Sequence, residues 1–262
     1  MSVKYDSIGI GYNRTRRADT YLLKRIYENL SPDSSGLYLD IGCGTGNYTH
    51  GLHQAGLRMV GIDPSETMLK IASVANNDIS WLWGEAENTG LENASVHGAV
   101  ATLTIHHWPN LERGFSEINR VLRKSGRIVI FTSTPEQMEG YWLNHYFPVM
   151  MKSSIDQMPT LSKVTSALES AGISWVSCEK YSVKPDLQDL FLYCGKDNPD
   201  LYFDPAIRQG ISSFSSLANA VEVEAGLRQL KDDVISGKVK EVIESFENDL
   251  GDYLFIMGQK KD

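Results

Sequence analysis

Residues 39–47 read Leu39-Asp40-Ile41-Gly42-Cys43-Gly44-Thr45-Gly46-Asn47. The apolar residues end a predicted buried strand, and three glycines at every second position lead into a helical pattern. The turn from strand to helix is where an open α/β sheet binds its ligands. Glycines let backbone approach a ligand closely, and the first N–H groups of the helix add donors. The stretch predicts a ligand-binding loop; a tight turn that merely requires glycine is the alternative.

The spacing of the glycines separates two kinds of ligand. A dinucleotide-binding loop requires a third glycine at position 47, where this sequence has Asn47. Asp40, just before the loop, would repel a pyrophosphate but suits a ligand that carries an ammonium group and a sulfonium. The loop therefore favours a ligand with a cationic end.

Apolar runs alternate with amphipathic stretches from about residue 18 to residue 133, which predicts a doubly wound parallel sheet. After this region, residues 138–151 are crowded with aromatic residues and methionines around Pro148, and they predict an irregular apolar lid. We expect strands at 37–41, 58–62, 79–83, 99–103, 127–131, 174–182 and 252–258, and helices at 18–30, 47–55, 65–75, 110–123 and 161–171.

Residues 184–248 carry three or four helical patterns and no Gly/Ser-rich linker. They predict a helical insertion rather than a second domain. The main domain is then formed by residues 1–183 and 249–262, with 184–248 as its cap.

The net charge and the cysteine spacing argue against several kinds of binding partner. With 25 Lys and Arg against 33 Asp and Glu, the formal net charge is −8, which disfavours nucleic acids and anionic membranes. The three cysteines never form a C-x-x-C pair, and His50 with His53 at helical spacing favours packing over a metal site. Because no secretion signal and no long apolar run is visible, we expect a cytoplasmic protein without a membrane span or a metal.

Acidic residues follow the next two predicted strands. Asp63, in Gly61-Ile62-Asp63-Pro64-Ser65, lies where an acid accepts hydrogen bonds from ribose hydroxyls; helix capping is the alternative. Glu85, in Gly84-Glu85-Ala86-Glu87, is placed to reach an adenine edge, with a solvated acidic loop as the alternative.

Together these segments resemble the class I S-adenosylmethionine-dependent methyltransferases, closest to the small-molecule group that includes ubiquinone and menaquinone methyltransferases. The resemblance covers residues 36–133 and extends to Ala101-Thr102-Leu103-Thr104-Ile105-His106-His107-Trp108 and Arg120-Val121-Leu122-Arg123-Lys124-Ser125-Gly126-Arg127. The adenine loop departs from the family, where Asp is commoner than Glu85. Tyr12, Arg16 and Arg17 look like the tyrosine and arginine that the family folds over the cofactor's carboxylate, although the proline that often follows the arginine is missing.

The resemblance implies a Rossmann-like, doubly wound seven-stranded sheet whose last strand is antiparallel, supplied by residues 252–258. It implies S-adenosylmethionine as cofactor, S-adenosylhomocysteine as product and a small-molecule acceptor under the cap. The cofactor-binding residues it implies are Tyr12, Arg17, Asp40, Gly42, Cys43, Gly44, Gly46, Asn47, Asp63, Pro64, Met68, Glu85, Ala86, Thr102 and Leu103.

Methyl transfer is an in-line displacement that chiefly requires positioning and exclusion of water. His106 and His107 are the candidates for a general base; loop residues that only shape the pocket are the alternative. Tyr141, Trp142, His145 and Tyr146 are the candidates for the acceptor pocket, and an ordinary buried helix contact is the alternative. The segment after the fourth strand is unlike the Asn-Pro-Pro-Tyr type of enzymes that methylate adenine or glutamine amides, which disfavours nucleic-acid amino groups.

Two other functions remain open from sequence. A nicotinamide oxidoreductase would bind NAD or NADP, against which Asn47 and Asp40 argue. A cofactor-binding regulator without catalysis would bind S-adenosylmethionine but lack an acceptor pocket.

Overall fold

Seven strands form one mixed sheet in the structure, a computed structural model that describes residues 14–33 and 35–261. In chain order they are β1 (Leu37–Ile41), β2 (Arg58–Asp63), β3 (Ser80–Trp83), β4 (Val96–Thr102), β5 (Leu122–Thr132), β6 (Ile173–Tyr181) and β7 (Tyr253–Lys260). The order across the sheet is β3-β2-β1-β4-β5-β7-β6. Strands β1 to β5 pair in parallel, and β7 runs antiparallel between β5 and β6. The predicted fold class is therefore confirmed.

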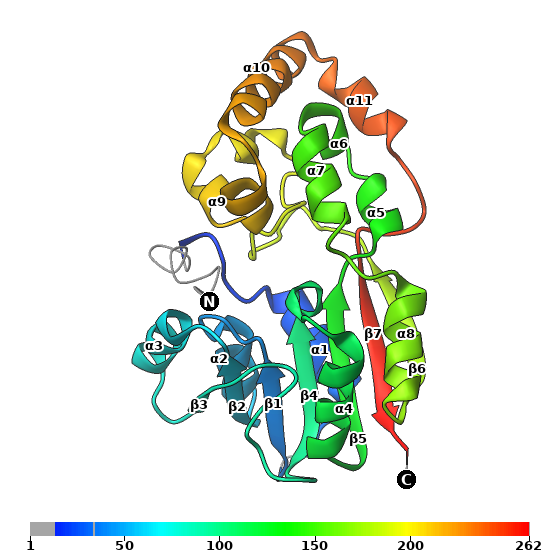
Figure 1. Ribbon diagram of the computed structural model, residues 1–262. Helices are drawn as coiled ribbons and strands as arrows, with labels where there is room; N and C mark the ends of the chain where they lie inside the picture. The colour runs from blue at the N-terminus through cyan, green and yellow to red at the C-terminus, as the bar shows by residue number, and fades with distance from the viewer. Residues whose placement is uncertain (1–13, 34, 262) are drawn as a thin grey trace.

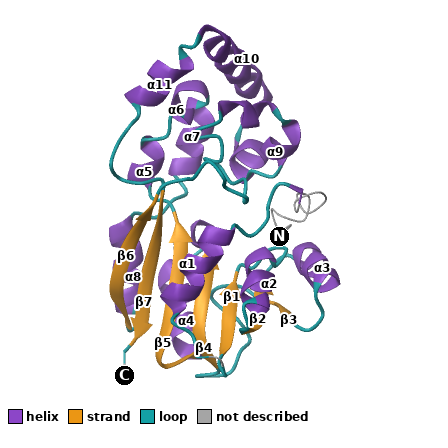
Figure 2. Cartoon of the chain, turned by 180° about the vertical axis from the view of Figure 1, so that it is seen from behind, coloured by secondary structure: helices purple, strands orange, loops and turns teal. Residues whose placement is uncertain are grey.

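Helices cover both faces of the sheet because side chains alternate along each strand. In β5, Val129 and Phe131 pack on one face and Ile128 and Ile130 on the other. Helices α1 and α2 lie on the first face, and α4 and α8 on the second (Figures 1 and 2). The bounds of the sheet helices are α1 (Thr20–Leu30), α2 (Asn47–Gln54), α3 (Glu66–Ala75), α4 (Leu111–Val121) and α8 (Leu161–Ser170).

A helical cap stands over the carboxyl ends of the parallel strands (Figure 2). Its elements are α5 (Pro135–Glu139), α6 (Leu143–Tyr146), α7 (Pro148–Ile155), the 3-10 helix η3 (Pro199–Phe203), α9 (Pro205–Gln209), the π-helical turn η4 (Ser213–Leu217), α10 (Ala220–Ser236) and α11 (Val239–Ser245).

The expectation of irregular structure at residues 138–151 was wrong, although the segment does belong to the cap. Short helices form there, and Pro148 is the first residue of α7, where the missing N–H of proline costs no hydrogen bond. Glu222 of α10 accepts hydrogen bonds from the N–H groups of Val149 and Met150, so the predicted insertion packs on α7. The cap thus combines α5–α7 with the segment 184–248. The domain division at residue 183 stays a prediction.

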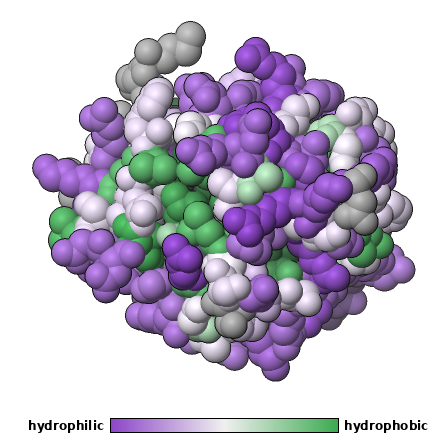
Figure 3. Space-filling view, turned by 90° about the horizontal axis from the view of Figure 1, so that it is seen from below, coloured by the Kyte–Doolittle hydropathy of each residue, from purple (hydrophilic) through white to green (hydrophobic). Residues whose placement is uncertain are grey.

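Hydrophilic side chains dominate the molecular face seen from below, with a smaller area of hydrophobic ones among them (Figure 3). Within the described ranges, no helix is both long and apolar enough to cross a bilayer.

Candidate active site

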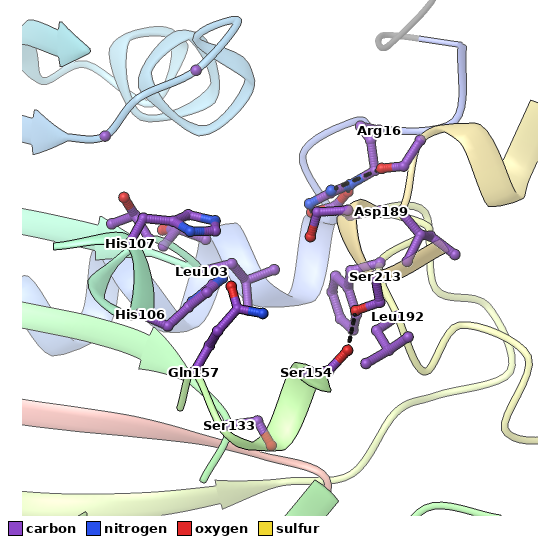
Figure 4. A pocket seen from close by; sticks show the side chains of 18 of the residues that line it. Arg16, Leu103, His106, His107, Ser133, Ser154, Gln157, Asp189, Leu192 and Ser213 are labelled. Atoms are coloured by element: carbon purple, nitrogen blue, oxygen red, sulfur yellow. Dashed lines mark hydrogen bonds and ion pairs between the residues drawn. The ribbon is translucent and has the colours of Figure 1, made fainter. Parts of the chain in front are cut away.

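A cavity of about 180 Å³ lies where the carboxyl ends of β1, β2 and β4 face the cap. The sheet order reverses between β1 and β4, which is the point where open α/β sheets bind ligands. Residues from the glycine loop, from the segment after β4 and from the cap all line this cavity (Figure 4).

The glycine loop is fixed to β2 by its backbone. The N–H groups of Gly42 and Cys43 donate to Ile62 O at 2.8 and 3.0 Å. Gly42 has φ +71°, and a Cβ there would lie 2.1 Å from Thr104 Oγ1, so only glycine fits. Gly44, with φ +55°, faces open space with no atom within 4 Å of an added Cβ. The loop therefore presents bare backbone to the cavity, a cradle that a side chain would fill.

Asp63 joins the end of β2 to this loop. Its Oδ2 accepts a hydrogen bond from Gly44 N and its Oδ1 one from Ser65 N, both at 2.8 Å. Asp63 also lines the cavity, as does Met68 of α3.

Asp40 lies beneath the loop rather than in the cavity wall. It is buried, and Thr49 Oγ1 donates to its Oδ2 at 2.6 Å. Burial raises the pKa of the Asp40 carboxyl to about 6, and the negative charge of Asp63 adds to the effect, while the bond from Thr49 opposes it. Its negative charge therefore acts on the cavity from behind the loop.

Gly46 also shapes the loop without lining the cavity. It has φ +79°, and a Cβ would lie 2.4 Å from Trp81 Cη2. The absence of a side chain at Gly46 is required by packing against β3.

His106 and His107 form the 3-10 helix η2 (Ile105–His107) directly after β4, and both line the cavity. Their ring centroids are 3.9 Å apart. Figure 4 shows them near Leu103, across the pocket from Ser154, Ser213 and Leu192. The structure thus brings both candidate bases to the same cavity as the glycine loop.

Arg16, rather than Arg17, reaches the cavity from the segment before α1. Its guanidinium pairs with Asp189, and Asn47 Nδ2 donates to its backbone carbonyl at 2.9 Å. Arg17 is exposed and is not in the cavity wall. Tyr12 lies outside the described residues.

The aromatic residues predicted for the acceptor pocket lie elsewhere. Tyr141 stacks on Tyr193 with centroids 3.7 Å apart, Trp142 Nε1 donates to Lys196 O at 3.2 Å, and Tyr146 Oη donates to Asp233 at 3.1 Å. His145 is exposed and contacts Gln229. Trp142 and Tyr146 hold the cap together because their polar ends are satisfied within it, whereas Tyr141 Oη donates to Asp252 O and so ties the cap to the start of β7. The cap residues that line the cavity, which sequence reasoning missed, include Met138, Ser154, Gln157, Met158, Asp189, Leu192 and Ser213.

The proposed cofactor residues divide between the cavity wall and its surroundings. Those outside the wall, besides Arg17, are Asp40, Gly46, Pro64, Glu85 and Ala86. Those in the wall are Gly42, Cys43, Gly44, Asn47, Asp63, Met68, Thr102 and Leu103. Among the described residues, no group of three or more His, Cys, Asp or Glu side chains is arranged to hold a metal ion.

Comparisons with known proteins find similarity to methyltransferases. Residues 39–130 match the family model described as a methyltransferase domain. An uncharacterised methyltransferase of Mycobacterium tuberculosis is 33% identical over 141 residues, or 54% of this chain and 56% of the relative. The alignment thus spans little more than half of that relative. The demethylmenaquinone methyltransferase of Oceanobacillus iheyensis is 26% identical over 76% of this chain and 84% of the relative.

A crystal structure from Anabaena variabilis, assigned as a methyltransferase of an antibiotic biosynthesis pathway, superposes with a TM-score of 0.83. It is 34% identical, and the match covers 93% of this chain and 98% of that one. With the seven-stranded sheet and the glycine loop, this likeness shows that the chain belongs to the class I S-adenosylmethionine-dependent methyltransferases.

Proposed function

We propose that this protein binds S-adenosylmethionine along the glycine loop and Asp63 and transfers its methyl group to a small molecule under the cap. The observation that carries the proposal is the hydrogen bond from Gly44 N to Asp63 Oδ2 in the wall of the cavity that His106 and His107 line. This hydrogen bond holds the backbone of Gly44, which has no side chain, next to the carboxylate of Asp63. A nucleoside with a positively charged tail suits such a pair, because its ribose hydroxyls can donate to the carboxylate while its body lies close to the backbone.

The chain's residues suit the different parts of this cofactor. Asp63 is a carboxylate in the cavity wall, a suitable acceptor for ribose hydroxyls, and Met68 offers an apolar contact nearby. Asp40 supplies negative charge behind the loop for an ammonium group and a sulfonium. The remaining cofactor positions that the family resemblance implies, including Glu85 and Ala86 for adenine, stay part of the proposal.

The cofactor, when bound, supplies a methyl group on a positively charged sulfur. That methyl group would pass to the acceptor atom, and the electron pair of the carbon–sulfur bond would stay on the sulfur. The cap excludes water and holds the acceptor in line. His106 and His107 lie at the end of β4, where an imidazole takes up the proton that a hydroxyl acceptor loses.

A small molecule is the acceptor that this enclosure admits. The cavity lies beneath the cap, and the net charge of −8 opposes the approach of nucleic acids.

Calorimetric titration with S-adenosylhomocysteine tests the proposal, with NAD as the competing ligand. The wild-type protein should bind S-adenosylhomocysteine and not NAD. Asp63→Ala should weaken that binding by about a hundredfold, because two hydrogen bonds to a charged group are lost. Asp78→Ala is the control, since Asp78 is exposed and lies outside the cavity wall. A preference for NAD, or equal binding by wild type and Asp63→Ala, would contradict the proposal.

A further inference from the structure

The cap side of the cavity carries a polar pair that the proposed cofactor site does not use. Ser154 of α7 and Ser213 of η4 both line the cavity, and their hydroxyl oxygens lie 2.9 Å apart. Both residues are buried, with 5% and 6% of their surface exposed. Figure 4 shows this pair across the pocket from His106 and His107.

The protons of the two hydroxyls can be counted. Ser154 Oγ lies 2.9 Å from Met150 O as well as from Ser213 Oγ, and each hydroxyl has one proton. When Ser154 donates to Met150 O, Ser213 donates to Ser154 and keeps its own acceptor positions. When Ser154 donates to Ser213, the proton of Ser213 is available to a ligand. The pair therefore either accepts or donates, which matches a ligand hydroxyl because that group also does both.

Apolar side chains line much of the cavity around the pair, together with the polar Gln157 and Ser212. The serines and their apolar neighbours in the lining form what we call the cap wall: Met138, Ser154, Met158, Leu192, Ser213 and Leu217. Flexible methionine side chains adapt to the shape of an apolar ligand. The wall thus suits a largely apolar part of a ligand that carries a hydroxyl group at this end.

The charges around the cavity argue against an anionic acceptor. Among the described lining residues, the Asp, Glu, Lys and Arg side chains are Arg16, Asp63 and Asp189. Arg16 forms an ion pair with Asp189, and Asp63 lies at the glycine loop. The cap wall contains no cationic side chain, so a carboxylate or phosphate buried against it would lose hydration without a counter-charge.

We propose that the acceptor is an uncharged, largely apolar molecule with a hydroxyl group that hydrogen-bonds to the Ser154–Ser213 pair. The pair holds the end of the acceptor that points away from His106 and His107. This inference rests on the proposed function, because it takes the cap side of the cavity as the acceptor site.

Three probes of equal chain length test the charge preference: 1-octanol, octanoate and octyl phosphate. Each is titrated calorimetrically into the protein, with and without saturating S-adenosylhomocysteine. The alcohol should bind at least about tenfold more tightly than either anion, because only the anions bring an unpaired charge into the cavity.

Two serine variants test the hydrogen bond. Ser154→Ala and Ser213→Ala should each weaken 1-octanol binding by about fivefold, the effect of one neutral hydrogen bond, and leave S-adenosylhomocysteine binding unchanged. Ser153→Ala is the matched control, since Ser153 lies on α7 beside Ser154 but outside the lining. This variant should bind 1-octanol like wild type.

The inference is overturned if an anion binds as tightly as the alcohol, if no probe binds, or if both serine variants bind the alcohol like wild type. A loss of alcohol binding in Ser153→Ala equal to that in Ser154→Ala would also overturn it. Failure of the proposed function would show as no binding of S-adenosylhomocysteine. The relative affinities of the three probes are measured without S-adenosylhomocysteine, so the two failures can be told apart.

Discussion

Arg16 and Asp189 lie 173 residues apart in the chain and form an ion pair in the wall of the cavity. Asp189 is 2% exposed, and Tyr48 Oη donates to its second oxygen at 3.1 Å. Arg16 also reaches Gly210 O, so it contacts the cap at two places. The pair ties the segment before α1 to the cap.

Removing one partner of this pair should destabilise the protein strongly. Asp189→Asn leaves the Arg16 guanidinium without its counter-charge, at an expected cost of about 3 kcal/mol in the free energy of unfolding. Adding Arg16→Gln should recover part of that loss, because the unpaired charge is gone. Urea unfolding of the two single variants and the double variant measures the coupling. The exposed pair Lys152–Asp156 is the control, with a coupling below about 0.5 kcal/mol; additive effects at Arg16 and Asp189 would contradict the prediction.

Gly44 should be needed for ligand binding rather than for folding. Gly44→Ala places a methyl group into the open space of the cradle, so binding of S-adenosylhomocysteine should fall by at least about tenfold. Gly56→Ala is the matched control, because Gly56 also has positive φ, +98°, and no atom within 4 Å of an added Cβ. Both variants carry backbone strain of about 1 kcal/mol. Calorimetric titration should show weakened S-adenosylhomocysteine binding in Gly44→Ala and wild-type binding in Gly56→Ala. Equal affinities in the two variants would show that the cradle does not contact the ligand.

The sheet was predictable from the sequence because its signals are local. The apolar runs 37–41 and 58–62 lie within one residue of β1 and β2, and the loop between Ile41 and Asn47 begins and ends where its glycines indicate. Antiparallel β7 was expected from the family resemblance, since its partner β5 lies more than a hundred residues earlier. A local sequence pattern predicts where a strand lies in the chain, but it does not predict which other strand it pairs with.

The cap side of the cavity was not predictable in the same way. Ser154 and Ser213 lie 59 residues apart, and Asp189 joins them from a third segment, so no spacing marks them as neighbours. The aromatic cluster was the stronger signal in sequence, yet Tyr141 and Trp142 are buried outside the cavity wall. Large apolar side chains in a sequence predict that a segment is buried. Burial alone does not distinguish the wall of a pocket from packing between helices.

Glu117 should make stability depend on pH in acid. Burial alone would raise the pKa of this carboxyl, but hydrogen bonds from Arg120 and Thr89 outweigh it and lower the pKa to about 2. Since the pKa falls below its unfolded value, the stabilisation is present above about pH 4.5 and is lost as the pH falls toward about 2. Glu117→Gln should therefore cost about 2 kcal/mol at pH 7 and less at pH 3, measured by urea unfolding. Glu112→Gln, an exposed position on the same helix, should change little at either pH.

Asp40 should show the opposite dependence on pH, because burial raises its pKa to about 6. Its contribution to stability is then complete below about pH 3.8 and is lost as the pH rises through about 6. Asp40→Asn keeps an acceptor for Thr49 and removes the buried charge. The variant should be about 2 kcal/mol more stable than wild type at pH 8, with the difference vanishing near pH 3.5 in thermal unfolding.

The same substitution should cost binding of the cationic ligand. S-adenosylmethionine carries a sulfonium that S-adenosylhomocysteine lacks, so the negative charge of Asp40 attracts the former more strongly. In Asp40→Asn, the affinity for S-adenosylmethionine should fall about threefold to tenfold more than that for S-adenosylhomocysteine at pH 8. Equal losses for the two ligands would show that Asp40 acts only through the shape of the loop. The variant could gain stability and lose affinity selectively for S-adenosylmethionine. That result would mean that the buried Asp40 carboxylate serves binding of the positively charged ligand and lowers the stability of the fold.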